Sequence, residues 1–363
     1  MSVQRKSVTR KMVNGIIESQ EIFVGLEDSK KTWKVCVRAN KQIVNEASMP
    51  AKYDTLKAYF DNNFPRCKVH VIYEAGFKGF GLYYALTTDG HACTVVPPHT
   101  VVQAKCSRVK NDRSDARLLA KNLEDGNCGA CHVPDQERLA DRQVVRSLNM
   151  VNKDIKQAKN RVRSFLFMYG IETGIVVATW TDNHYKRLRQ IEVANPVLRE
   201  YLDDLLDRLF FLWVQRDKYV KKLRELSKKE RYVRFVKIAK TLPGVGVLTA
   251  IRLVLELGED LTRFTSGEEI ASFVGLGGVE HSTGETEKKG GISKQGNKMV
   301  RAWLVESAWV AIRKDPALQV FYSRIKQNSG HYNKAIVAVA RKLITRLRSC
   351  VVNDTNYVFG VVQ

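Results

Sequence analysis

The feature that most constrains the fold is an alternation of apolar and polar residues between positions 20 and 40. Val24 and Leu26 stand two positions apart before a short polar segment, residues 28–31, and the alternation resumes at Trp33. Because successive side chains of a strand point to opposite faces of a sheet, this pattern predicts a β-hairpin. A third strand is expected soon after it.

The segment that follows changes between helical and strand-like patterns. Residues 50–62 have helix-like spacing, whereas residues 67–73 form a short β-rich run that ends at Glu74. A strand at residues 92–96 stops at two prolines, and a basic segment at residues 105–122 leads into a helix. Together these elements predict a mixed α/β unit.

The composition changes between about residues 135 and 235, where stretches rich in Lys, Arg, Asp, Glu, Leu and Val predict a helical coiled-coil arm. An apolar stripe recurs there at steps of three and four residues, which places it on one helix face. It consists of Leu202, Leu205, Leu206, Leu209, Phe210 and Trp213. Dimerisation is the favoured use of this stripe, and packing within one chain is the alternative, since spacing does not say which helix the stripe meets.

Helical patterns and glycine-rich loops predict a mostly α-helical C-terminal unit. The string TLPGVGVLTA at residues 241–250, followed by an apolar helix to Leu257, resembles a helix-hairpin-helix motif. Gly244 and Gly246 would let the backbone come close to a phosphate, and the helix N-terminus beyond them offers free N–H donors. A simple glycine turn between two core helices is the alternative.

The charge of the chain indicates a polyanionic partner. Among 363 residues, 60 Lys and Arg outnumber 38 Asp and Glu, which leaves a formal charge of +22 spread along the sequence. Nucleic acid is the partner that this excess favours. The basic N-terminus lacks the apolar core of a signal peptide, and no run of about 18 apolar residues occurs. We therefore expect a cytoplasmic, nucleoid-associated protein of a bacterium or archaeon, with no membrane partner.

Four carboxylates are candidates for metal-dependent phosphoryl transfer. This chemistry needs several carboxylates that converge on two cations about 4 Å apart. Glu27 and Glu74 end predicted strands, and Asp112 and Asp115 lie three residues apart in a predicted helix, which puts them on one helix face. Any one of them alone would be interpreted as a solvated acidic residue. Their order and their positions at element ends make the arrangement informative.

Several sequence blocks are distinctive when they are taken together, namely VGLEDSKKTW, YEAGF, KNDRSDARLLAKNL, LPGVGVLTA and FVGLGGVEHSTGETEKKGGISKQGNKMVRAWLVESAW. They resemble the blocks of the insertion-sequence-110 family of DEDD transposases, also described as bridge-RNA-guided recombinases, and follow that family's order over nearly the whole chain. The resemblance implies an RNase H-like (RuvC-like) α/β domain at residues 1–134. It further implies a helical coiled-coil dimerisation region at 135–235 and a mostly α transposase domain at 236–363.

The family's metal-binding tetrad, expected to hold Mg²⁺, would fall on Glu27, Glu74, Asp112 and Asp115. The first position departs from the family pattern, which usually has Asp there, and Asp28 follows immediately. Either Glu27 reaches the same metal or Asp28 substitutes for it. Strand alternation favours Glu27, because adjacent side chains point to opposite faces.

The family's catalytic serine loop corresponds to Ser282-Thr283-Gly284. Ser282 is the expected nucleophile, and Thr283 is the less favoured alternative. The resemblance implies an insertion-sequence transposase that cuts and rejoins donor and target DNA through a covalent phosphoserine intermediate. It also implies a noncoding guide RNA and a homodimer that assembles into a tetramer. Further residues are assigned to nucleic-acid contact, namely Lys110, Arg113, Arg117, Gly244, Gly246, Lys288, Lys289, Lys294, Lys298 and Arg301.

Two rival functions remain open at the level of sequence. In a metal-only nuclease of the RuvC-like, structure-specific type, water attacks the phosphate and Ser282 is an ordinary loop residue. In a noncatalytic nucleic-acid-binding protein, the departure at Glu27 marks a decayed site. Substitution of Ser282 separates the first rival from the serine mechanism, and substitution of Glu74 tests the second.

Overall fold

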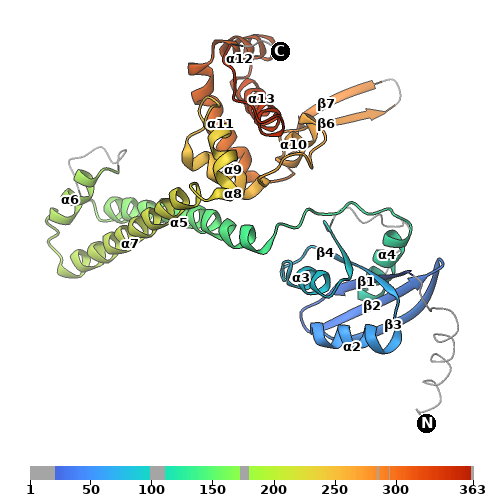
Figure 1. Cartoon of the computed structure of the whole chain (residues 1–363). Helices are drawn as coiled ribbons and strands as arrows, with labels where there is room; N and C mark the ends of the chain where they lie inside the picture. Colours follow the sequence, from blue (N-terminus) through green and yellow to red (C-terminus); the bar gives the residue numbers. More distant parts are fainter. Residues whose placement is uncertain (1–20, 99–110, 172–179, 284–285, 294, 361–363) are drawn as a thin grey trace. The chain divides into compact units, whose positions relative to one another are not determined.

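The computed structural model describes residues 21–98, 111–171, 180–283, 286–293 and 295–360, with the backbone alone for the residues of 279–289 that it includes. The chain divides into two compact units, residues 1–133 and 134–363 (Figure 1). Each unit is described by itself. The three-part division that the sequence predicts remains a prediction.

The first unit is built on a five-stranded sheet in the order β3-β2-β1-β4-β5. Strand β1 pairs antiparallel with β2 and parallel with β4, β2 pairs antiparallel with β3, and β4 pairs parallel with β5. The strands are β1 (Glu21–Asp28), β2 (Thr32–Ala39), β3 (Gln42–Pro50), β4 (Lys68–Glu74) and β5 (Ala92–Val96). The predicted hairpin, third strand and later strands are thus confirmed, and the mixed α/β sheet fits an RNase H-like domain.

Helices cover both faces of this sheet. Helices α2 (Tyr53–Asn63) and α3 (Gly81–Thr88) bury Leu56, Phe60 and Leu86 in one core with the strand residues Val24, Leu26, Val71 and Tyr73. Helix α4 (Asp112–Glu124) lies on the opposite face, where it packs on Cys36 and Ile72. Alternate residues of β1 and β4 therefore face different helices.

The second unit is mostly helical (Figure 1). Its first part contains α5 (Gln136–Met168), α6 (Asp182–Gln190) and α7 (Pro196–Leu226). Its second part contains α8 (Glu230–Ala239), α9 (Val247–Leu257), α10 (Gly267–Phe273), α11 (Lys298–Lys314), α12 (Pro316–Ser329) and α13 (Tyr332–Val352), with a hairpin of β6 (Gly278–Thr283) and β7 (Thr286–Ile292) between α10 and α11.

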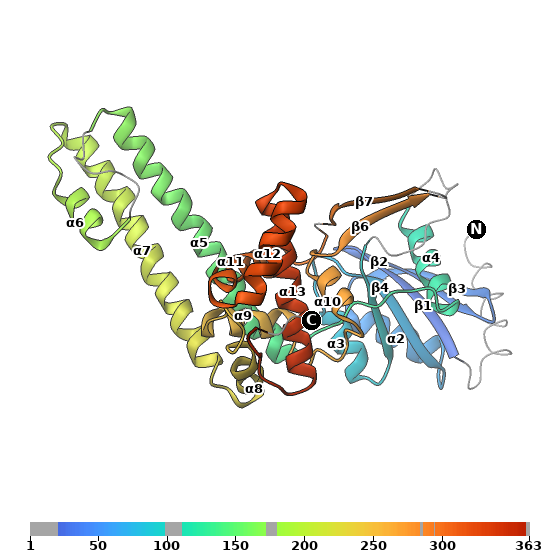
Figure 2. The ribbon, with the colours of Figure 1, turned by 90° about the horizontal axis from the view of Figure 1, so that it is seen from above.

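Helices α5 and α7 lie side by side and form a long arm (Figure 2). The leucines of the α7 stripe are buried within the chain, against residues of α5 such as Val162, Phe165 and Ile155. The interpretation of these leucines as a dimer contact is therefore wrong, and the alternative of packing within one chain holds. Phe210, from the same stripe, is 52% exposed.

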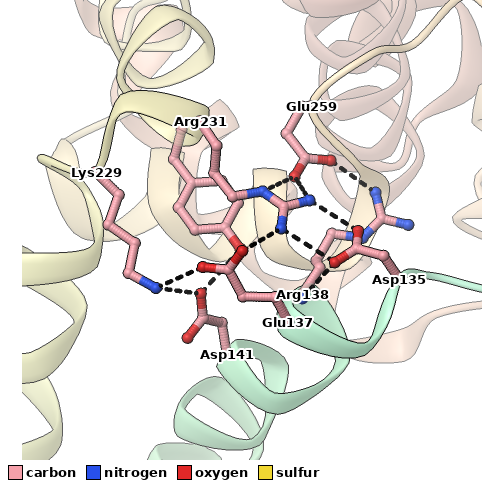
Figure 3. Close-up of polar contacts among 8 residues, drawn as sticks. Asp135, Glu137, Arg138, Asp141, Lys229, Arg231 and Glu259 are labelled. Carbon is pink, nitrogen blue, oxygen red and sulfur yellow. Dashed lines mark hydrogen bonds and ion pairs between the residues drawn. The ribbon is translucent and has the colours of Figure 1, made fainter.

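A network of ion pairs joins the start of α5 to α8 and to the end of α9 (Figure 3). Arg231 donates to both carboxylate oxygens of Asp135, at 3.0 and 2.7 Å, and to Glu259 at 2.6 Å. Arg138, 6% exposed, donates to Glu259 at 2.9 Å. Some of these paired residues, such as Arg231 and Asp135, are more than 90 positions apart in the sequence. The network therefore fixes the root of the arm, where α5 begins, on the helical body.

Within the described ranges of the chain, no helix is long and apolar enough to span a membrane.

Candidate active site

The position of helix α4 depends on Gly25 in strand β1. A Cβ atom placed on Gly25 would lie 2.0 Å from the carbonyl oxygen of Ala116 and 2.4 Å from the backbone nitrogen of Ala120. The helix backbone therefore touches the strand directly, and the small side chains of Ala116 and Ala120 permit this approach. This contact holds the first turn of α4 near the end of β1.

This contact also determines where the two aspartates of α4 lie. Asp112 lies one helical turn before Ala116, so both residues are on the side of α4 that faces the sheet, and Asp115 is a near neighbour on the same turn. The helix begins where the Asn111 side chain accepts a hydrogen bond from the Ser114 backbone N–H at 2.8 Å. Both aspartates thus occupy the first turn, where the helix dipole favours negative charge.

The glutamates end two neighbouring parallel strands at the same level. Leu26 of β1 pairs with Tyr73 of β4, and Glu27 and Glu74 are the next residues of the two strands. Glu27 lies two residues beyond Gly25, and Glu74 two beyond Ile72, which both contact α4. Since alternate residues share a face, both glutamates lie on the α4 side of the sheet.

The four carboxylates are close enough to interact electrostatically. The pKa of Glu27 is raised from 4.5 to about 7, first by burial and then by the negative charges of Glu74, Asp115 and Asp112. Oxygen ligands of this kind suit a hard divalent cation. Among the residues that the structure describes, no three Asp, Glu, His or Cys side chains stand close enough to hold one ion.

Asp28 has hydrogen-bond partners of its own, although its charge also contributes to the raised pKa of Glu27. Its carboxylate accepts a hydrogen bond from Lys78 Nζ at 2.7 Å and from Trp33 Nε1 at 2.5 Å. Asp28 follows Leu26 on the face that α2 and α3 cover, opposite to Glu27. The two acidic neighbours thus have different surroundings, which supports Glu27 as the first carboxylate.

The basic residues near α4 that were predicted to contact nucleic acid differ in whether a carboxylate of the chain already binds them. Arg113 is exposed and lines a cavity of about 240 Å³ beside Lys34 and Glu46. Arg117 instead donates two hydrogen bonds to Glu46, at 2.5 and 2.7 Å, so an internal carboxylate already occupies its guanidinium. Lys110 lies outside the described residues.

The predicted nucleophile lies on a hairpin of the second unit. Ser282 and Thr283 are the last residues of β6, where they pair with Glu287 and Thr286 of β7. They belong to strands, whereas the sequence had predicted a loop, and Gly284 lies outside the described residues. The backbones of Lys288 and Lys289 pair with His281 and Glu280. Lys294 also lies outside the described residues.

Close backbone contacts fix the base of this hairpin. A Cβ atom on Gly275 would lie 2.3 Å from the carbonyl oxygen of Gln295, and one on Gly296 would lie 2.3 Å from that of Phe273. The segments before β6 and after β7 therefore cross in direct contact. Arg301 donates to the Val274 carbonyl at 3.5 Å, so it supports this crossing. Lys298, at the start of α11, is exposed.

Comparison with known proteins assigns the chain to a family. A model described as "Transposase IS116/IS110/IS902 family" matches residues 236–323, and a DEDD transposase model matches residues 24–170. The putative transposase y4qE of Sinorhizobium fredii is 31% identical over 305 residues, which are 81% of this chain and 73% of that protein. The chain belongs to the IS116/IS110/IS902 transposase family. It is therefore an enzyme of transposition, and its DEDD domain indicates dependence on a divalent metal.

Other relatives of this transposase cover similar shares of both chains. The transposase for insertion sequence element IS1533 of Leptospira borgpetersenii is 26% identical over 66% of this chain and 70% of its own length. The pilin gene-inverting protein of Moraxella lacunata is 23% identical over 91% of this chain and 92% of its own length.

Glu256 is a buried residue of this transposase whose role the sequence did not predict. Its carboxylate accepts from Arg142 at 2.7 Å and from the Asn297 side chain at 3.0 Å, and the Asn297 side chain also caps α11. The network thus links the arm helix α5 to the segment that follows the Ser282 hairpin. The only sequence signal is a lone acid in the apolar string VLTAIRLVLEL.

The two glycines of the 241–250 turn have different surroundings. Gly244 has a φ of +81°, and a Cβ atom there would lie 2.2 Å from the carbonyl oxygen of Ser307, so the close approach it permits is to α11. Gly246 faces open space and begins α9. A cavity of about 760 Å³ lies beside it. Four cations without an ion pair in the described part of the chain line this cavity, namely Arg224, Lys228, Lys237 and Lys240.

Proposed function

We propose that this transposase cuts and rejoins DNA in a Mg²⁺-dependent reaction that passes through a covalent phosphoserine intermediate. The observation that carries the proposal is the raised pKa of Glu27, which results first from burial and then from the charges of Glu74, Asp115 and Asp112 near the same edge of the sheet. Four carboxylates at one sheet edge repel one another, and cations relieve that repulsion. Bound Mg²⁺ would stabilise negative charge on the phosphate and on the oxygen that leaves it.

A rigid element of the fold fixes the position of each carboxylate that would hold the metal. Glu27 and Glu74 come from adjacent rigid strands, which fixes the distance between them. Asp112 and Asp115 come from a helix whose position Gly25 sets. A site on strands and a packed helix keeps its geometry better than one on loops.

Ser282 acts as the nucleophile in this proposal. Its Oγ forms a bond to the phosphorus of a DNA phosphate, its proton passes to solvent or to a neighbouring base, and the bond to one strand oxygen breaks. The released strand keeps a hydroxyl end. Attack of a second strand's hydroxyl on the phosphoserine restores the phosphodiester and frees Ser282, so no external energy source is needed. One relative that matches most of this chain is named a pilin gene-inverting protein, and inversion of a gene requires rejoining as well as cleavage.

DNA and RNA contacts are assigned to the basic surfaces. The residues Lys288, Lys289 and Lys298 near the hairpin, and Arg113 near the carboxylates, would neutralise backbone phosphates. The cavity lined by Lys237 and Lys240 beside the N-terminus of α9 supports the helix-hairpin-helix interpretation, in which a phosphate meets free N–H groups. We assign choice of site to pairing with a noncoding guide RNA.

The assembly in this proposal is a tetramer made of two dimers. The carboxylates and Ser282 belong to different compact units of the chain. Assembly allows a complete site to form between subunits as well as within one. The leucines of α7 are used within the chain, so a dimer contact on the arm must use other residues.

Substitution of the two hydroxyl residues tests the nucleophile. Ser282→Ala is expected to abolish both strand exchange and the protein-linked DNA that denaturation traps from the unmutated enzyme, whereas Thr283→Val retains both. The substrate is DNA that carries the element's own ends, with the noncoding transcript that flanks the gene. If Ser282→Ala cuts at the unmutated rate and no protein-linked DNA is trapped, the enzyme is a metal-only nuclease.

Substitution of Glu74 tests the metal site separately. Glu74→Gln keeps the size of the side chain but removes a charge, and it is expected to lower Mg²⁺-dependent cleavage at least about a hundredfold. Full activity of Glu74→Gln, or activity in excess chelator, would contradict the proposed carboxylate site.

A further inference from the structure

A second pocket lies along the arm, away from the Ser282 hairpin. It has a volume of about 590 Å³ and lies between α5 and α7, with Trp180 as a third wall. Residues that line it include Ile155 and Lys159 from α5, and Phe210, Trp213 and Arg216 from α7. The volume falls within the range of roughly 300–1,000 Å³ that is common for small-molecule sites.

Aromatic rings gather around this pocket. Tyr185 stacks on Phe210, with centroids 6.0 Å apart and planes at 25°, and meets Trp213 edge-on at 5.3 Å. Phe210 is 52% exposed, although the adjacent Leu209 is fully buried. Because the leucines already join α7 to α5, Phe210 contributes little to helix packing. Tyr185 covers one face of the Phe210 ring, and the 52% exposure leaves the rest of the ring available to a ligand.

Two cations, Lys159 and Arg216, and two carboxylates, Asp182 and Asp217, line the pocket. Lys159 Nζ lies 5.6 Å from the ring centroid of Trp180 and 5.9 Å from that of Trp213. Burial, and then the charges of Arg163 and Arg216, hold the pKa of Lys159 below its usual value. The carboxylates that line the pocket interact with other cations, since Asp182 lies 3.3 Å from Lys186 and Asp217 lies 3.2 Å from Arg216. Within the described ranges, Lys159 has no carboxylate partner.

We propose that this pocket binds one unpaired nucleotide of a single-stranded nucleic acid, with its base against Phe210 and Trp213 and its phosphate at Lys159. Aromatic rings beside a cation are the features by which proteins hold single strands, and here Lys159 is the lining cation that has no carboxylate partner within the described ranges. The inference rests on the proposed function, because it takes a nucleic acid as the partner. It adds a site on the arm, separate from the carboxylates and from Ser282.

The same geometry selects against duplex. A base within a duplex has both faces covered by its neighbours, so it cannot stack on Phe210 without leaving the helix. An unpaired base has a free face and enters without that cost. Unpaired guide RNA and displaced DNA share this chemistry, and the experiment distinguishes them.

Photocrosslinking tests the site directly. Single-stranded RNA and single-stranded DNA that carry 5-iodouracil are irradiated with the full-length protein in excess chelator and competitor duplex, and the crosslinked residue is identified by mass spectrometry. We expect crosslinks at Phe210 or Trp213. Phe210→Ala is expected to lower the yield at Trp213 about tenfold and to weaken binding of the same oligonucleotide. The oligonucleotide that gives the stronger signal identifies the RNA or DNA source.

Two matched variants on the same helices serve as controls. Phe211 is 60% exposed and adjacent to Phe210 but does not line the pocket, so Phe211→Ala should retain the crosslink. Lys159→Gln should lower the yield severalfold, whereas Lys156→Gln, at an exposed position of α5, should not. Melting curves establish that each variant is folded. If Phe210→Ala does not fold, the lysine pair decides the question.

Three outcomes would overturn the inference. Crosslinks that map only elsewhere, equal losses in Phe210→Ala and Phe211→Ala, or a yield unaffected by Lys159→Gln would each do so. Loss of a dimer in Phe210→Ala without loss of the crosslink would show that the pocket is a contact between copies of the chain. Failure of the proposed function is distinguishable, because it appears as unchanged cleavage in Glu74→Gln, whereas this experiment uses no metal and no cleavage.

Discussion

Gly25 and Ala116 bring strand β1 and helix α4 into backbone contact, since a methyl group on Gly25 would stand 2.0 Å from the Ala116 carbonyl oxygen. The distance between the two glutamates on the sheet and the two aspartates on the helix therefore depends on a residue with no side chain. No other residue type permits this approach without moving the helix.

Gly25→Val is expected to push α4 off the sheet and to separate Asp112 and Asp115 from Glu27. We expect a loss of about 1–3 kcal/mol in the free energy of unfolding, typical of overpacking, together with loss of Mg²⁺-dependent cleavage. Denaturant unfolding and a cleavage assay measure the two effects. Gly129→Ala is the control, because a Cβ atom there meets nothing within 4 Å. Normal cleavage by a folded Gly25→Val protein would refute this account of the site.

Glu27 makes the stability of the metal-free protein depend on pH. Its folded-state pKa is raised from 4.5 to about 7, so its contribution to stability is fully present below about pH 4.5 and is lost as the pH rises through 7. In excess chelator, Glu27→Gln is expected to melt roughly 3–8 °C above the unmutated protein at mildly alkaline pH, and the difference should vanish in acid. Melting curves over a pH series measure this.

Mg²⁺ provides the counter-test for Glu27. A cation bound by the carboxylates removes their repulsion, so Mg²⁺ should raise the melting temperature of the unmutated protein more than that of Glu27→Gln. Equal shifts in the two proteins would mean that Mg²⁺ binds elsewhere.

Asp28 and Glu27 are expected to respond differently to loss of charge. Asp28→Asn weakens the contact with Lys78 and should cost about 1–2 kcal/mol of stability while folded protein keeps its cleavage rate. Glu27→Gln should remove cleavage without a comparable loss of stability. Cleavage rates normalised to folded protein measure the difference. The reverse pattern would assign the first metal position to Asp28.

Arg231 is expected to stabilise the root of the arm. Arg231→Met removes its hydrogen bonds to Asp135 and Glu259 and should lower the free energy of unfolding by roughly 2–3 kcal/mol near neutral pH. The Arg231 guanidinium holds the pKa of Asp135 below its usual 3.8, so this contribution is present above that pH and is lost as the pH falls through the folded value. The deficit of Arg231→Met should therefore shrink in acid.

Arg234 provides the matched control on helix α8. It pairs with Asp354 at 2.7 Å, where both side chains are more than half exposed, and donates to the Val351 carbonyl at 2.9 Å, so Arg234→Met should cost about 1 kcal/mol. Chemical unfolding followed by circular dichroism over a pH series compares the two variants. Equal deficits would show that the network in Figure 3 contributes no more than an exposed pair.

Local sequence patterns predicted most elements of the first unit and the ends of strands at which Glu27 and Glu74 lie. The prediction succeeded because side chains of a strand alternate between the two faces of a sheet, and the β1 residues Ile22, Val24 and Leu26 on one face all enter the same core. The sequence pattern also predicted the helix that contains Asp112. Local patterns did not show that Arg117 is bound by Glu46, since the two residues are 71 positions apart and meet only through the sheet.

The sequence by itself determined which side of each element is apolar, where the carboxylates stand along the chain, and the family to which the chain belongs. Only the tertiary structure decided what each face meets. The α7 leucines pack on α5 of the same chain, and Gly244 permits contact with Ser307. Periodicity records that a side chain is buried, but the identity of its partner depends on how distant segments are brought together, which no local spacing encodes.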